Sequence, residues 1–179
     1  MKRALAATGL TLLAVICPLN AQKRESDIID WNKRPEWKEK SLKNESDTTR
    51  VYRELLQTPF WGQALARLTI EPDRSGELIT KVRDYHEPHS ITTTSRKLDS
   101  AEVDNFLSGL DEAEFWFSDS TEEPSPGLKD ADVCTLEGAS RGTYQAVQRA
   151  IPPRTQFTRV CEYFVRPALV KAANSGRKR

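Results

Sequence analysis

The sequence predicts an α+β domain in which helices pack on one face of an antiparallel sheet. Three strand-like runs follow one another across short turns, at residues 64–70, 77–85 and 90–98. Two more flank a glycine-rich turn, at residues 132–137 and 143–151. Helical patterns precede, separate and follow these two groups. We therefore expect a three-stranded meander plus a hairpin, in the order α-βββ-α-ββ-α.

Apolar residues at helical spacing predict a first helix that ends at Pro59. Ser46 or Asp47 can cap its start, because the side-chain oxygen of either residue accepts a hydrogen bond from a free backbone N–H. The apolar positions of this helix are Val51, Tyr52, Leu55 and Leu56.

The runs of the meander alternate in polarity or are rich in β-branched residues, as half-buried strands are. The first run places Ala66, Leu68 and Ile70 on one side of its strand. An antiparallel sheet of this kind can keep one face in water. On that wet face we expect a candidate binding surface formed by Arg67, Lys81, Arg83 and Thr92 or Thr93.

A second helix is expected to begin at a capping box formed by Asp99 and Glu102. Its apolar residues recur at helical spacing: Val103, Phe106, Leu107 and Leu110. The aromatic run Phe115-Trp116-Phe117 follows the helix. Such a run is either an exposed anchor for a partner or part of the core, and in a small domain we expect the core.

The hairpin turn is expected at residues 138–142, and Pro152-Pro153 ends the second strand. With a five-residue turn, Glu137 and Arg149 lie on facing strands and can point to the same side. Their functional interpretation is a polar pair in a binding face. The simpler interpretation, which we favour, is a cross-strand ion pair.

A last helix carries an apolar stripe, with Pro167 bending or ending it. The stripe consists of Phe157, Val160, Cys161, Phe164 and Val165. Cys134 and Cys161 are the two cysteines outside the N-terminal leader, and we expect them to form a disulfide in an oxidising compartment.

The N-terminus has the three parts of a secretory signal peptide at residues 1–21: Lys2 and Arg3, an apolar stretch, and Leu19-Asn20-Ala21 before the cut. Lipidation at Cys17 is a weaker alternative, because Ile16 rather than a small residue precedes it. We divide the rest into a charged tether at 22–45, a single domain at 46–173 and a basic tail at 174–179. The tether can dock Trp31 or Trp37 on the domain or on a partner. From the signal peptide we expect a periplasmic or secreted protein.

Charge and composition narrow the classes of function. The chain has 27 Lys and Arg against 26 Asp and Glu, which gives no drive toward nucleic acid, and no apolar run is long enough to span a membrane once the signal is removed. It lacks the glycine-rich nucleotide loops and the Gly-x-Ser-x-Gly elbow, so we expect no cofactor. His86 and His89 lack further ligands for a metal, and a metal carrier using them is the weakest hypothesis.

The C-terminal part resembles a family of secreted bacterial proteins that carries no established activity. The resemblance rests on a spaced pattern: Phe115-Trp116, Asp132, Leu136-Glu137-Gly138, Gly142-x-Tyr144, Val147-x-Arg149 and Pro152. It implies the hairpin and export. Together with the residues, it favours an exported binding or interaction protein of the cell envelope. The alternative is a small periplasmic hydrolase with a carboxylate-based site.

Overall fold

The computed structural model describes most of the chain after the predicted signal peptide. The described residues are 30–45, 49–60, 62–83, 90–119, 130–150 and 155–176. Residues 1–21, the start of the predicted tether, and both His86 and His89 lie outside them.

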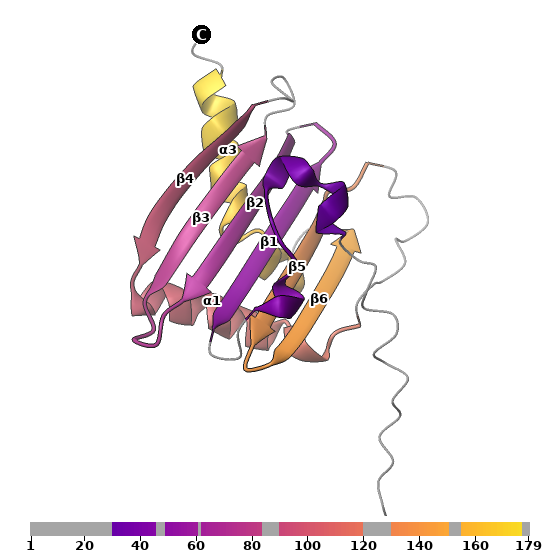
Figure 1. Ribbon diagram of the computed structural model, residues 1–179. Helices are drawn as coiled ribbons and strands as arrows, with labels where there is room; N and C mark the ends of the chain where they lie inside the picture. The colour runs from indigo at the N-terminus through magenta and orange to yellow at the C-terminus, as the bar shows by residue number, and fades with distance from the viewer. Residues whose placement is uncertain are drawn as a thin grey trace, which may run out of the picture.

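Among the described residues, six antiparallel strands form one sheet in the order β4-β3-β2-β1-β5-β6 (Figure 1). The predicted α+β class is confirmed. The predicted meander and hairpin correspond to β2 (Gly62–Ile70), β3 (Gly76–Arg83), β4 (Ile91–Leu98), β5 (Val133–Ser140) and β6 (Thr143–Ala150).

The remaining strand, β1 (Arg50–Thr58), stands where we predicted the first helix, and that prediction is wrong. β1 lies between β2 and β5, with Tyr52 opposite both Leu68 and Gly138. Both of its faces are covered, so residues 51–56 are all buried. A strand buried on both faces carries apolar side chains at neighbouring positions. The pairs Val51-Tyr52 and Leu55-Leu56 therefore imitate the spacing of a helix.

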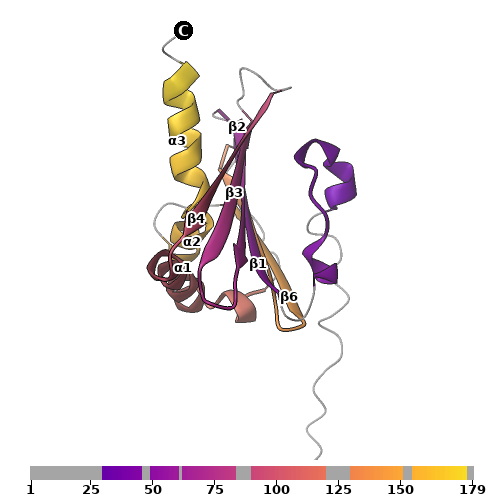
Figure 2. The same cartoon turned by 60° about the vertical axis from the view of Figure 1, so that its left-hand side comes forward.

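Helices cover one face of the sheet, as predicted (Figure 2). α3 (Val165–Gly176) contacts β1, β2 and β3, while α2 (Gln156–Cys161) contacts β5 and β1. α1 (Ser100–Glu112) crosses behind the lower end of the sheet in Figure 1. The core between these layers includes Tyr52, Leu68, Leu78, Phe106, Leu136, Phe164 and Val165.

The start of α1 follows the prediction only in part. The carboxylate of Asp99 accepts a hydrogen bond from the Glu102 backbone N–H at 2.8 Å. The Glu102 carboxylate does not complete the box but pairs with Arg96 of β4 at 2.8 Å. One capping bond is therefore present, and the second acid ties the helix to the edge strand.

The predicted last helix is divided into α2 and α3 by a turn at residues 162–164. Pro167 neither bends nor ends a helix. It lies in the first turn of α3, where its missing N–H removes no helical hydrogen bond. α3 continues to Gly176, three residues into the predicted basic tail.

Cys134 of β5 and Cys161 of α2 form the predicted disulfide, with their Cα atoms 6.2 Å apart. Both residues are fully buried in the core. The bond ties the last helical segment to the hairpin. In the chain-entropy model, a closed loop of this length stabilises the fold by about 3.5 kcal/mol.

The opposite face of the sheet is covered by residues 30–45, which we call the N-terminal strap (Figure 2). The strap contains three short 3₁₀ helices: η3 (Trp31–Lys33), η4 (Pro35–Trp37) and η5 (Leu42–Asn44). Trp31 and Trp37 pack on Leu55 and Leu65 of the sheet, and Leu42 packs in a second buried cluster. This part of the predicted tether is thus docked on the domain through its large apolar side chains.

The hairpin turn consists of Arg141-Gly142, and the predicted five-residue turn is wrong. Both residues have positive φ, at 52° and 74°, as a type I′ turn requires. Gly138, which we expected in the turn, lies inside β5. A Cβ at this position would come within 2.9 Å of the Phe115 ring. The glycine signal here marks close packing of aromatic rings rather than chain reversal.

Candidate functional site

The predicted binding face is present, but the N-terminal strap covers it. Arg67, Lys81 and Arg83 all lie on this face, as does Thr93, whereas Thr92 lies on the helix face. Thr93 itself stays exposed on the edge strand β4.

Acidic side chains of the strap neutralise these cations. Lys81 Nζ lies 2.7 Å from Glu39 Oε1, and Arg67 lies 3.3 Å from Glu39 Oε2. Arg67 also pairs with Glu45 at 2.7 Å, and Arg83 pairs with Glu36 at 3.3 Å. The cations predicted to meet a ligand therefore hold the protein's own N-terminal segment.

Arg53 and Glu137 form the buried centre of this face. Arg53 Nη1 lies 2.9 Å from Glu137 Oε2, and both residues are almost completely buried. The same carboxylate accepts hydrogen bonds from Trp31 Nε1 at 3.0 Å and from the Tyr144 hydroxyl at 2.7 Å. Burial lowers the pKa of the Arg53 guanidinium, while the nearby Glu137 and Glu39 carboxylates raise it. Glu137 is thus a structural anchor for the strap.

Arg149 does not join Glu137, and the predicted pairing of the two is wrong. The two-residue turn places Glu137 opposite Ala146 and Arg149 opposite Cys134. Glu137 and Arg149 therefore point to opposite faces of the sheet. Arg149 donates instead to the backbone oxygen of Asp119 at 2.8 Å.

A fully buried carboxyl group, Glu54, lies on the helix face. Its Oε2 accepts hydrogen bonds from the backbone N–H groups of Phe164 and Val165, at 3.1 Å and 3.3 Å. Burial raises the pKa of Glu54 well above its ordinary value. Its position caps the start of α3 and lies outside the pocket described next.

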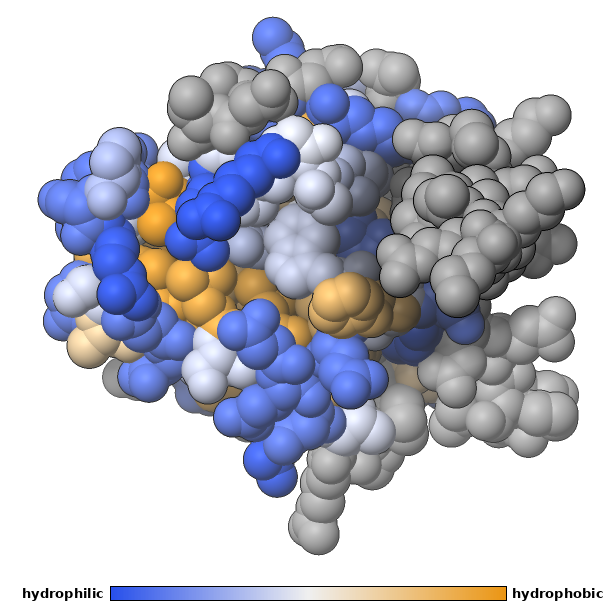
Figure 3. Space-filling view, turned by 90° about the horizontal axis from the view of Figure 1, so that it is seen from below, coloured by the Kyte–Doolittle hydropathy of each residue, from blue (hydrophilic) through white to orange (hydrophobic). Residues whose placement is uncertain are grey.

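A pocket of about 730 Å³ lies at the lower end of the sheet, and we call it the basal pocket. Three chain segments meet there: the start of β1, the turn between β2 and β3, and the turn between β5 and β6. α1 and the following 3₁₀ turn η6 (Phe115–Phe117) form the other side. Seen from this end, the surface has an apolar area framed by hydrophilic residues (Figure 3).

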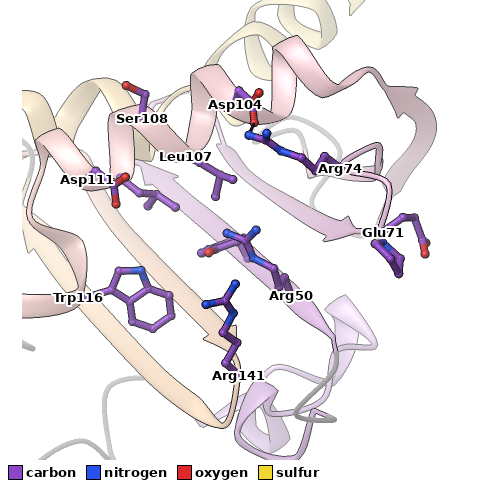
Figure 4. A pocket seen from close by; sticks show the side chains of 12 residues that line it. Arg50, Glu71, Arg74, Asp104, Leu107, Ser108, Asp111, Trp116 and Arg141 are labelled. Atoms are coloured by element: carbon purple, nitrogen blue, oxygen red, sulfur yellow. Dashed lines mark hydrogen bonds and ion pairs between the residues drawn. The ribbon is translucent and has the colours of Figure 1, made fainter.

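Two arginines of the basal pocket have no partner among the described residues. Arg50 and Arg141 point into the same space (Figure 4), yet neither forms an ion pair or hydrogen bond there. The Nε atom of Arg50 is buried without an acceptor. Tyr52, which lines the same wall, also makes no hydrogen bond through its hydroxyl within the described residues. Arg50 is only half-buried and Arg141 is exposed, so their other guanidinium N–H groups can donate to an acceptor from outside.

The apolar part of the basal pocket comes mainly from α1 and η6. Leu107 and Leu110 of α1 line it together with Trp116 (Figure 4). The aromatic run is therefore divided: Phe115 is in the core, Trp116 lines the pocket, and Phe117 is 91% exposed. Our prediction that the run belongs to the core holds for Phe115 and in part for Trp116, which is half-buried and packs against the core, but it is wrong for Phe117.

Carboxylates complete the lining on the side of α1. Asp104 forms an ion pair with Arg74. Asp111 lies near the end of the helix and has no ion-pair or hydrogen-bond partner for its carboxylate among the described residues. Among the described residues, the pocket thus presents unpaired cations at Arg50 and Arg141, an unpaired carboxylate at Asp111 on its helix wall, and another at Glu71 in the turn between β2 and β3.

We did not predict the basal pocket from the sequence. The structure itself marks the site, because Arg141-Gly142 occupies a type I′ turn whose first position favours Asn or Gly. An arginine held at a φ of 52° is unfavourable for the turn, and such residues concentrate at functional sites. Arg74, also in the lining, has a φ of 71°. Arg50 carried no signal, because we had assigned its segment to a helix.

No group of three or more His, Cys, Asp or Glu side chains in the described residues is placed to hold a metal ion. In the same residues, no helix is long and apolar enough to span a membrane.

Comparison with models of known protein families finds no match to the chain, and comparison with curated proteins finds no significant match. The resemblance to a family of secreted bacterial proteins stays a prediction.

Proposed function

We propose that the protein is an exported binding protein of the bacterial cell envelope, and that it binds an organic anion in the basal pocket. The observation that carries this proposal is the pair of unpartnered guanidinium groups, Arg50 and Arg141, in one partly apolar cavity. Guanidinium groups bind carboxylate and phosphate oxygens through charge-assisted hydrogen bonds. Trp116 and Leu107 beside them suit an apolar body.

Export is supported by two independent features of the chain. The N-terminal sequence has the layout of a signal peptide. The buried Cys134–Cys161 disulfide is of a kind that persists in oxidising compartments such as the periplasm. We infer a periplasmic or secreted location from both.

We favour binding over catalysis because of where the carboxyl groups lie. An acid catalyst needs a carboxyl group with a raised pKa within reach of its substrate. Glu54, whose pKa burial raises, is committed to the backbone at the start of α3 and does not line the pocket. The alternative of a carboxylate-based hydrolase therefore gains no support from the geometry.

A matched pair of ligands tests the proposal. We expect 2-naphthoate to bind in a calorimetric titration, and its uncharged analogue 2-naphthamide to bind about tenfold more weakly, because only the acid can pair with the arginines. Arg141→Asn should reduce the difference between the two ligands. The same change should keep or raise stability, since Asn suits the positive φ of this turn.

Arg159→Gln is the control, because Arg159 is an exposed arginine of α2 outside the pocket. It should leave both affinities unchanged. Equal binding of acid and amide to the unmodified protein, or an unchanged preference in Arg141→Asn, would contradict an anion site. Failure of 2-naphthoate to bind at all would contradict the proposed function as a whole.

A further inference from the structure

The basal pocket carries opposite charges that remain apart, two arginines on its strand side and an acid on α1, while a further acid, Glu71, lies in the turn between β2 and β3. Arg50 and Arg141 belong to the strand wall, and Asp111 belongs to α1 (Figure 4). No ion pair joins Asp111 to either arginine, whereas Arg74 and Asp104, at another part of the lining, do pair. A ligand with only a negative charge would match one wall and leave the other unmatched.

The end of α1 adds to the negative character of the helix wall. Asp111 lies in the last turn of the helix, which contains no basic residue. The carbonyl groups at a helix C-terminus carry partial negative charge, and a cation is favoured there. A positively charged group placed at this end would therefore meet both the Asp111 carboxylate and the helix terminus.

We infer that the ligand of the basal pocket is a zwitterion of the kind that a short unblocked peptide presents. This inference rests on the proposed function and names the ligand class. The acid group lies at Arg50 and Arg141, and the amino group lies at Asp111. The apolar side chains of the ligand lie on Trp116 and Leu107. A volume of about 730 Å³ is large enough for a dipeptide.

Four forms of one dipeptide test this assignment. The free peptide Leu-Phe carries both charges, and N-acetyl-Leu-Phe carries the negative charge alone. Leu-Phe-amide carries the positive charge alone, and N-acetyl-Leu-Phe-amide carries neither. Because Asp111 is exposed, we expect the free amino group to tighten binding by about threefold to fivefold, measured as Leu-Phe against N-acetyl-Leu-Phe.

Asp111→Asn should abolish this gain and leave the affinity for N-acetyl-Leu-Phe unchanged. Glu112→Gln is the matched control, because Glu112 is the next acid on α1 and does not line the pocket. It should retain the gain.

The outcomes separate the two levels of the proposal. Equal affinities of Leu-Phe and N-acetyl-Leu-Phe, or a gain that survives Asp111→Asn, would overturn the zwitterion assignment. So would the absence of binding by all four peptides. In each of these cases the proposed function stands if 2-naphthoate binds at the arginines, and it falls with the inference if 2-naphthoate does not.

Discussion

At the scale of single residues, neighbouring charges on β1 show how the sheet separates two environments. Arg53 and Glu54 are adjacent and both buried, and alternation along the strand sends them to opposite faces. Arg53 is met by the carboxylates of Glu137 and Glu39. Glu54 meets only backbone N–H groups through one oxygen, and its second oxygen has no partner among the described residues. The ionised form of Glu54 is therefore less stable in the folded protein than the protonated form.

This asymmetry predicts a pH dependence of stability for Glu54→Gln. The pKa of Glu54 is raised in the folded protein, so the folded state holds a proton that the unfolded state releases. Glu54 therefore stabilises the folded state fully below the ordinary glutamate pKa. This stabilisation is lost as the pH rises through the raised pKa that Glu54 has in the folded protein. Relative to the unmodified protein, the variant should become progressively more stable as the pH rises from 4 to 7.

Urea denaturation of both proteins across this pH range provides the measurement, and carboxyl groups common to both cancel in the difference. A stability difference that is independent of pH would show that Glu54 titrates normally. Glu162, which lies close enough to raise the Glu54 pKa further, should be tested as a second variant, Glu162→Gln.

At the scale of elements, the N-terminal strap forms one of the layers of the fold. Its 3₁₀ helices cover one face of the sheet with two tryptophans, and its acids neutralise a row of cations. Glu39 is the most connected of these acids, because its carboxylate reaches Arg53, Arg67 and Lys81 within 3.3 Å. Glu36, by contrast, reaches only Arg83 among the described residues and is exposed.

Replacing these two acids should therefore have unequal effects. Glu39→Gln leaves Lys81 without a carboxylate partner among the described residues and removes a second carboxylate from Arg53 and Arg67, so it should lower the free energy of unfolding by about 3 kcal/mol. Glu36→Gln removes an exposed pair and should cost less than about 1 kcal/mol. Denaturant unfolding of the two variants and of the unmodified protein measures both changes in the free energy of unfolding. Effects of similar size would mean that the strap is held by its tryptophans alone.

Some elements of the fold could be predicted from the sequence and others could not. β3 and α1 were predictable because each buries one face and so shows a regular period, whereas β4, which is exposed along most of its length, was predictable from its β-branched residues. β1 was not, because burial on both faces removes the alternation. The strap was read as a tether because three large apolar residues, Trp31, Trp37 and Leu42, are dispersed among charges. The acids of the strap pair with cations on the sheet, and this pairing becomes visible only in the structure.

At the scale of the whole molecule, the basal pocket could not be predicted because its parts are remote in sequence. Arg50 and Arg141 are brought together only by the pairing of β1 with β5, which a helical assignment of residues 50–58 conceals. The predicted site residues Arg67, Lys81 and Arg83 do share one face. Their partners, however, come from the same chain rather than from a ligand.

Export and the disulfide make a joint prediction for the intact protein. Material isolated from the native host should have the mass of residues 22–179 less two hydrogen atoms, measured without reductant. Reduction should restore the two hydrogens. A chain that retains Met1 would contradict cleavage, whereas a correctly cleaved chain with free thiols would contradict the bond while leaving export intact.

The strap also has a consequence for the order of events during folding. Trp31 and Glu137, which share a hydrogen bond, are 106 residues apart in the chain. On the proposed export route the N-terminus crosses first, so the strap reaches the far side of the membrane before any strand that it covers. Its tryptophans have no surface to pack on until β1 and β2 have followed, and the Trp31 N–H has no Glu137 acceptor until β5 has followed. The strap, which crosses first, can therefore complete its contacts only after β5 has crossed. Until then its apolar side chains are exposed, and exposed apolar chain is prone to aggregation and proteolysis.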